Sequence, residues 1–291
     1  MKLSLGLTPR DYSVTGGAVV YDTDAQAYFT ANTAITSDAD KNAINTLFLN
    51  AKSNGYYSKI KIWYLPKWGS STADKWNLVN PLDTNGAFRL SFSTGFTHTT
   101  IGTSGDGTSA YANTNFVAST NLSLYDSHQA FYSRTTGNPA TTQIFIGNNS
   151  NTTTFNNKAQ WWLGYLNTGE VRSVQHSTAA TTDYASKTGE TSRAGFWINN
   201  RTSATATTLK VWKNGVAVAN ATTQATSQVL NTSSAYVWAR RNTVLASPQA
   251  EFFSDAQSTF ISIGAGLTDA EALALSNDVN TLMTYFGLNV Y

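Results

Sequence analysis

Alternation of apolar and other side chains is clearest over residues 207–219, where two short runs flank an Asn-Gly pair. Leu209 and Val211 stand at alternate positions before the pair, and two valines do the same after it. Both central residues of a type I′ turn need positive φ, which asparagine and glycine adopt at the least steric cost. The pattern predicts a β-hairpin with Asn214 and Gly215 at its tip. One face of this hairpin is apolar, so we expect it to pack on a second layer.

Similar short runs recur along the chain from residue 88 onward, and clusters of turn residues separate them. In the first run, Phe88, Leu90 and Phe92 alternate with arginine and serine. The others lie at 129–134, 143–147, 161–165, 195–199, 235–239 and 259–263. Several short strands separated in this way predict two antiparallel sheets packed as a sandwich.

A helical period replaces this alternation over residues 37–55. Ser37 followed by Asp40 resembles a capping box with aspartate in place of glutamate. The apolar stripe consists of Ile44, Leu47, Phe48 and Ala51. Asn54-Gly55 supplies the left-handed residue that ends a helix. The pattern predicts an amphipathic helix here, and Asp22 or Thr23 is placed to cap a shorter one over residues 24–29.

Two more features complete the predicted organisation. Ile60 and Ile62 alternate with lysines, which predicts a strand that ends before Pro66, and residues 69–85 are rich enough in turn residues to form a boundary. Near the other end, Thr268 and Glu271 form a full capping box. The helix that follows carries Leu275, Val279, Leu282 and Phe286 on one face and ends at Gly287. We expect that face to dock on the protein.

The composition limits the classes of partner. Charged residues make up 12% of the 291 residues, the net charge is +2, and there is no cysteine. The aromatic and lysine residues over 56–68 could suggest nucleic acid, but at this charge an amphipathic strand is the better interpretation, so no nucleic-acid partner is predicted. No run approaches the ~18 apolar residues of a membrane span, and no signal peptide is expected.

Titratable residues are few and scattered. The histidines are His98, His128 and His176, and the glutamates are Glu170, Glu190, Glu251 and Glu271. None of the histidines has a carboxylate at metal-ligand spacing, and the glutamates form no recognisable acid–base pair. The Gly-rich segment at 105–108 has one aspartate, which favours a tight turn over a calcium loop. We therefore predict no catalytic residue, no metal and no cofactor.

Aromatic residues are the main candidates for a binding role. Tyr165, Trp197 and Trp212 are candidates for stacking on a sugar ring. Alternation along a strand nevertheless turns half of such residues inward, where they form core. We expect one of the pair Trp161 and Trp162, and also Trp238, to be core.

Three segments have a distinctive order along the chain. They are Gly105-Asp106-Gly107-Thr108-Ser109-Ala110-Tyr111, then Trp212-Lys213-Asn214-Gly215-Val216, and finally Phe260-Ile261-Ser262-Ile263-Gly264 with Leu267-Thr268-Asp269-Ala270-Glu271. Together they resemble the pattern of concanavalin A-like (laminin-G-like) jelly rolls. The resemblance covers about residues 86–291 and implies a single sandwich with a C-terminal helix.

The N-terminal part of the chain makes this resemblance more specific. Residues 22–28, and then a helix that leads into residues 51–60, look like the start of structural proteins of tailed bacteriophages that carry such a jelly roll. The resemblance implies two parts: a helical and extended attachment segment at 1–85 and the jelly roll at 86–291. It implies a virion component and carries over no catalytic motif.

The function expected from these observations is that of a non-enzymatic virion structural protein exposed on the particle. It would be a capsid decoration, a fibre or a tail-associated protein, assembled in the bacterial host cytoplasm. Its partners would be other virion proteins and further copies of itself, in a trimer or an array. Two alternatives stay open: a carbohydrate-binding module that adsorbs to glycans on the host surface, and a glycan hydrolase.

Overall fold

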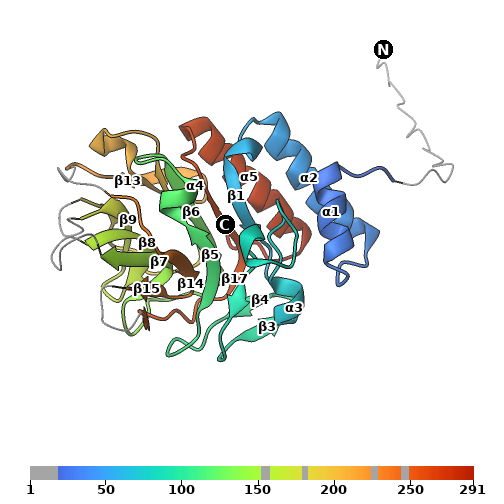
Figure 1. Cartoon of the computed structure of the whole chain (residues 1–291), viewed down its shortest axis with the longest axis horizontal. Coiled ribbons are helices and arrows are strands. Elements are labelled where there is room, and N and C mark those ends of the chain that lie inside the picture. Colours follow the sequence, from blue (N-terminus) through green and yellow to red (C-terminus); the bar gives the residue numbers. More distant parts are fainter. Residues whose placement is uncertain (1–18, 152–157, 179–182, 224–228, 244–248) are drawn as a thin grey trace, which may run out of the picture.

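A computed structural model describes residues 19–151, 158–178, 183–223, 229–243 and 249–291. Its strands form two sheets packed face to face, and helices α1, α2 and α5 gather on one side of this sandwich (Figure 1). Among the described strands every pairing is antiparallel except that of β15 with β7. The predicted antiparallel sandwich with helices at both ends of the chain is therefore confirmed.

Helices α1, α2 and α5 begin where the sequence places their caps. The described helices are α1 (Thr23–Ala31), α2 (Asp38–Ser53), α3 (Ser71–Asp74), α4 (Ala118–Asn121) and α5 (Asp269–Tyr285), with 3₁₀ turns at Tyr57–Lys59, Asn85–Ala87 and Ala206–Thr208. The Ser37 hydroxyl accepts the backbone N–H of Asp40 at the start of α2. Thr268 and Glu271 form the predicted reciprocal capping box at the start of α5. None of the helices in the described ranges is long and apolar enough to cross a membrane.

One sheet lies against the helices and is called the helix-side sheet here. In spatial order it contains β13 (Val216–Asn220), β12 (Lys210–Lys213), β11 (Gly195–Arg201), β6 (Ser127–Ser133), β17 (Ser258–Gly264), β4 (Gly102–Ser104) and β3 (Thr97–Thr99). Strand β1 (Ile60–Tyr64) pairs with the second half of β17.

The other sheet, called the outer sheet, forms the far layer. Its order is β10 (Ala185–Lys187), β9 (Glu170–Ser177), β8 (Lys158–Leu166), β7 (Gln143–Asn151), β14 (Ser234–Val237), β5 (Ala112–Val117) and β2 (Ser91–Phe92). Strands β15 (Arg240–Asn242) and β16 (Gln249–Glu251) join it beside β7. The run predicted as a strand at 88–92 is shorter in the structure, because Phe88 has a positive φ of 62° and the strand begins only at Ser91.

The predicted hairpin is β12–β13. Lys213 pairs with Val216, and Asn214 and Gly215 have φ values of 51° and 81°, as a two-residue primed turn requires. The expectation that its apolar face packs on a second layer holds for β12, whose Val211 is fully buried. It does not hold at the tip of β13, where Val216 is 62% exposed because β13 is an edge strand.

Two cores hold the layers together. The first lies between the helices and the helix-side sheet and joins the apolar stripes of α2 and α5 to Trp63 and Phe260. The second lies between the two sheets. Because β1 belongs to the helix-side sheet and α1 and α2 share the first core, residues 19–85 pack as part of the same body as the sandwich. The predicted boundary at residue 85 therefore does not separate two cores.

Candidate functional site

The three aromatic residues predicted as candidates for sugar stacking are enclosed by the protein. Trp197 and Tyr165 have no exposed surface and lie in the core between the sheets, where the Trp197 indole donates to the Arg193 carbonyl oxygen at 2.9 Å. Trp212 is 5% exposed and belongs to the core under the helices. No face of these rings is open to a ligand. The prediction that they stack on a sugar is therefore corrected, because all three rings are buried in the two cores.

The structure agrees with the prediction that one of Trp161 and Trp162, and also Trp238, is core. Trp161 and Trp238 are fully buried between the sheets, and the Trp238 indole donates to the Ala256 carbonyl oxygen at 2.8 Å. Trp162 points the other way from the outer sheet and packs with Ile144 and Val174. One member of the Trp161–Trp162 pair thus lies in the sandwich core, as the strand period requires.

Every glutamate in the chain lies within ion-pair distance of a basic side chain. The pairs are Glu170 with Arg172 at 2.9 Å, Glu190 with Lys213 at 2.5 Å, Glu251 with Arg240 at 2.6 Å and Glu271 with Lys59 at 2.5 Å. Glu271 also accepts the backbone N–H of Thr268 as part of its capping box. The pairs of Glu190, Glu251 and Glu271 join separate segments of the chain, whereas Glu170 pairs within strand β9.

Two of the histidines, His128 and His176, have no exposed surface. His128 Nδ1 lies 2.6 Å from the Ala265 carbonyl oxygen and its Nε2 lies 2.8 Å from the Ser262 hydroxyl. A carbonyl oxygen only accepts, so Nδ1 carries the proton. Burial lowers the pKa of His128 to about 4. His176 stacks on Trp161 with ring centroids 5.1 Å apart, and burial, followed by the nearby Arg201, lowers its pKa to about 3.

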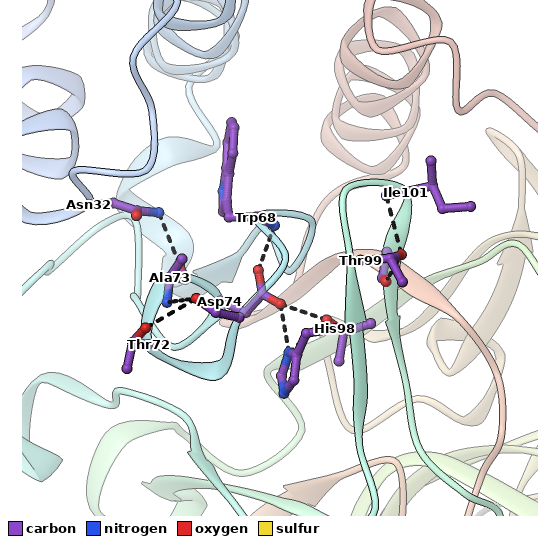
Figure 2. A network of polar contacts seen from close by, with 11 residues as sticks. Asn32, Trp68, Thr72, Ala73, Asp74, His98, Thr99 and Ile101 are labelled. Atoms are coloured by element: carbon purple, nitrogen blue, oxygen red, sulfur yellow. Dashed lines mark hydrogen bonds and ion pairs between the residues drawn. The ribbon is translucent and has the colours of Figure 1, made fainter.

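His98 has the contact that the sequence did not reveal. Its Nδ1 lies 2.7 Å from a carboxylate oxygen of Asp74, which is 1% exposed and stands at the end of the short helix α3. The same carboxylate accepts the Thr103 hydroxyl at 2.6 Å and the Trp68 backbone N–H at 2.7 Å. In Figure 2 this carboxylate points between Trp68 and the His98 ring, where the α3 turn meets the β3–β4 hairpin. Asp74 and His98 are 24 positions apart in the sequence, so no local motif reveals the pair.

A buried aspartate that orients a histidine is one part of an acid–base site. A nucleophile on the other ring nitrogen would be the next part. The hydroxyl nearest to this histidine is that of Thr103, which lies 3.1 Å from Nδ1 and donates to Asp74. The ring also packs edge-on against Phe92, with centroids 4.8 Å apart. The group therefore acts as a polar junction between two loops.

The Gly-rich segment at 105–108 forms a tight turn, as predicted. Asp106 accepts the backbone N–H groups of Thr108, Ser109 and Ala110 at 2.7–2.9 Å. Although burial acts to raise the pKa of Asp106, these hydrogen bonds hold it well below its usual range. Among the residues that the structure describes, no three His, Asp or Glu side chains gather to hold a metal ion.

The outward face of the outer sheet carries an open polar groove of about 530 Å³. It is lined by Asn113, Asn115, Val117, Thr232, Ser233, Ser234, Arg241 and Thr243. At its border the rings of Tyr111 and Tyr236 stack with centroids 4.5 Å apart and planes 15° from parallel. Tyr236 is the registered neighbour of Asn113 across strands β14 and β5. No local pattern in the sequence points to this groove, because its residues come from three separate segments.

Arg241 is the charged residue of this groove. Its guanidinium donates to the Ser234 hydroxyl and lies 5.4 Å from the centre of the Tyr236 ring. Within the described ranges, no carboxylate lies at ion-pair distance from it. The groove thus combines one held cation with neutral groups that donate and accept hydrogen bonds.

Comparison with known proteins gives likeness in structure alone. No family model matches the chain, and no curated protein matches its sequence. A Trypanosoma rangeli sialidase in complex with sialic acid has a TM-score of 0.46 and 12% identity over 75% of this chain and 33% of its own. A mutant of that sialidase with trans-sialidase activity has a TM-score of 0.49 and 10% identity over 82% and 39%.

A carbohydrate-binding module of a Ruminococcus gnavus sialidase, bound to sialyllactose, is also similar. It has a TM-score of 0.39 and 10% identity over 53% of this chain and 83% of its own. The chain spans about a third of the length of the first sialidase.

Proposed function

We propose that this chain is a non-enzymatic structural component of a tailed bacteriophage particle, exposed on it as a capsid decoration, fibre or tail-associated protein. The proposal takes its virion assignment from the resemblance of residues 22–60 and of the three jelly-roll segments. The observation that carries its non-enzymatic part is the pairing of all four glutamates with lysine or arginine. Most glycosidases use a pair of carboxyl groups, one as acid and one as nucleophile or base, whereas each of these glutamates is held in an ion pair by a lysine or arginine.

The proposed partners are other virion proteins and further copies of this chain, in a trimer or an array. A composition with only 12% charged residues suits close packing of subunits, because few charges must lose their water at an interface. Helices α1 and α2 are held in the core with α5, so contacts of the front segment would use the sides of these helices that face solvent.

The test locates the chain on its particle and measures turnover. A density map of the purified particle should show the sandwich at regularly repeated positions. The purified chain should release no reducing ends from glycans of the host surface. Turnover that Glu170→Gln or Glu190→Gln abolishes would overturn the proposal in favour of a hydrolase. Absence of the chain from purified particles would overturn the virion assignment.

A further inference from the structure

The polar groove on the outer sheet has a lining that a role in assembly does not explain. Its lining consists of asparagine amides and serine and threonine hydroxyls, with Val117 as its one apolar member among the described residues. Amides and hydroxyls both donate and accept hydrogen bonds. Sugar hydroxyls have the same dual character, whereas a peptide partner is anchored chiefly by side chains that fill apolar pockets. The lining therefore favours a saccharide.

One hydroxyl in this lining is buried without a partner. Ser233 is 9% exposed, and among the described residues its Oγ has no hydrogen-bond partner. A buried polar group that is left without a partner costs free energy. A ligand hydroxyl that reached the groove would satisfy it, so this atom marks a binding position.

Arg241 adds a charge requirement. The Ser234 hydroxyl and the Tyr236 ring hold its guanidinium in place, so little side-chain freedom is lost when an anion binds. The comparison with Arg172 on β9 is direct. Arg172 also lies over a tyrosine, 4.2 Å from the centre of the Tyr184 ring, but it is paired with Glu170 at 2.9 Å. Arg241 has the same aromatic support without that carboxylate.

Strand β5, which lines the groove together with Arg241, carries a bulge where it borders the groove. Register shifts between β14 and β5 opposite residues 113–117, and Asn115 has a positive φ of 58°. The Asn113 side chain accepts the Asn115 backbone N–H at 2.9 Å, and the Asn115 amide donates to the Arg89 carbonyl oxygen at 3.0 Å. Bulges of this kind re-aim side chains and are frequent beside binding sites. Here the bulge lies in the part of β5 where Asn113 and Asn115 line the groove.

We propose that this groove binds an acidic saccharide, with Arg241 pairing with a sugar carboxylate and the hydroxyl of Ser233 and the amides of Asn113 and Asn115 bonding to sugar hydroxyls. A guanidinium pairs with a carboxylate through charge-assisted hydrogen bonds, which are the strongest contacts available to this site. Affinity is therefore expected to depend on the charge of the sugar.

Calorimetric titration of the full chain tests this with four probes: trigalacturonate, its full methyl ester, triglutamate and inorganic phosphate. Trigalacturonate should bind saturably, and loss of the charged contact should weaken binding of the methyl ester by about tenfold or more. Triglutamate and phosphate should bind more weakly than the acidic sugar. Equal affinity for the ester, or equal or tighter binding of triglutamate or phosphate, would overturn the proposal, as would no saturation by trigalacturonate.

Variants locate the site. Arg241→Gln should weaken trigalacturonate binding about tenfold or more, whereas the matched control Arg172→Gln should leave it unchanged. Ser233→Ala breaks no side-chain hydrogen bond among the residues that the structure describes, so it should fold normally and weaken binding several-fold. It keeps the test decisive if Arg241→Gln does not fold. Equal losses in Arg241→Gln and Arg172→Gln, or unchanged binding in Ser233→Ala, would contradict the assignment. The result does not depend on where the chain lies on a particle.

Discussion

Replacing Val279 with aspartate is a direct test of how α5 contributes to the fold. Val279 has no exposed surface and lies in the core between the helices and the helix-side sheet. Losing its burial costs about 1.5–3 kcal/mol. An aspartate there must also take up a proton or remain ionised in an apolar setting, which adds about 3 kcal/mol for a pKa raised by two units or so.

The two contributions together predict a destabilisation of about 4–6 kcal/mol, which is a large part of the stability of an ordinary domain. For a chain of this length, a loss of that size lowers the melting temperature by about 10–20 °C. The assay is thermal unfolding followed by circular dichroism at neutral pH. The difference from wild type should narrow as pH falls from about 6 to about 4, because the buried carboxyl group then takes up its proton at a lower cost.

Leu273→Asp is the matched control, since Leu273 lies on the same helix and is 45% exposed. Its stability should change by about 1 kcal/mol or less. Equal losses in melting temperature for Val279→Asp and Leu273→Asp would refute the reasoning, because burial would then not decide the cost. An unchanged melting temperature in Val279→Asp would show that α5 contributes little to the folded state.

Three further predictions concern single residues. The pKa of about 4 at His128 lies below that of an unfolded histidine, so the folded chain takes up this proton only at lower pH than the unfolded chain. The resulting contribution to the free energy of unfolding, up to about 3 kcal/mol, should be complete above about pH 6.5 and lost as pH falls towards 4. His128→Gln should flatten this part of the stability profile measured by urea unfolding. Asp74→Ala should lower the free energy of unfolding in urea by about 3–5 kcal/mol because it leaves three donors without their buried acceptor, whereas His98→Ala should cost less; the reverse order would count against the junction. Gly264→Ala places a Cβ 2.1 Å from the Lys59 carbonyl oxygen and should cost about 1–3 kcal/mol, whereas Gly86→Ala meets no atom within 4 Å and should be neutral in the same thermal assay.

Features encoded within a few residues were predictable from the sequence. The Asn214-Gly215 turn, the Ser37 cap and the Thr268–Glu271 capping box each depend on residues within four positions of one another. Backbone sterics and short-range hydrogen bonds fix such features almost independently of the rest of the fold. They gave the correct hairpin register and the correct start of both long helices.

Alternation of apolar residues does not predict every strand, because the interior of this sandwich is partly polar. Gln175 on β9 is 1% exposed, and its amide donates to Asn199 of the opposite sheet at 2.7 Å. The Asn199 amide in turn donates to Gln129 at 2.9 Å. Alternation of apolar residues cannot reveal a strand whose inward side chains are amides. Such a network is stable when its members satisfy one another, which only the assembled sheets allow.

The prediction that Tyr165, Trp197 and Trp212 stack on a sugar fails for a related reason. Composition shows that a chain has many rings, but alternation leaves open which sheet face meets another layer. Here both faces of the helix-side sheet are covered, so Trp197 on one face and Trp212 on the other are both core. The partly exposed aromatic pair, Tyr111 with Tyr236, comes from positions 125 residues apart that only the pairing of β14 with β5 brings close.

This layering also limits where function can lie. The helix-side sheet is covered by helices on one face and by the outer sheet on the other, whereas the polar groove opens on the outward face of the outer sheet. Figure 1 shows α1, α2 and α5 at one side of the molecule, with β7, β8 and β14 at the opposite side. A subunit that packs on neighbours through its helix layer would therefore leave the groove free for ligand. If a structure of the particle instead showed neighbours packed over Arg241, assembly and saccharide binding would exclude each other.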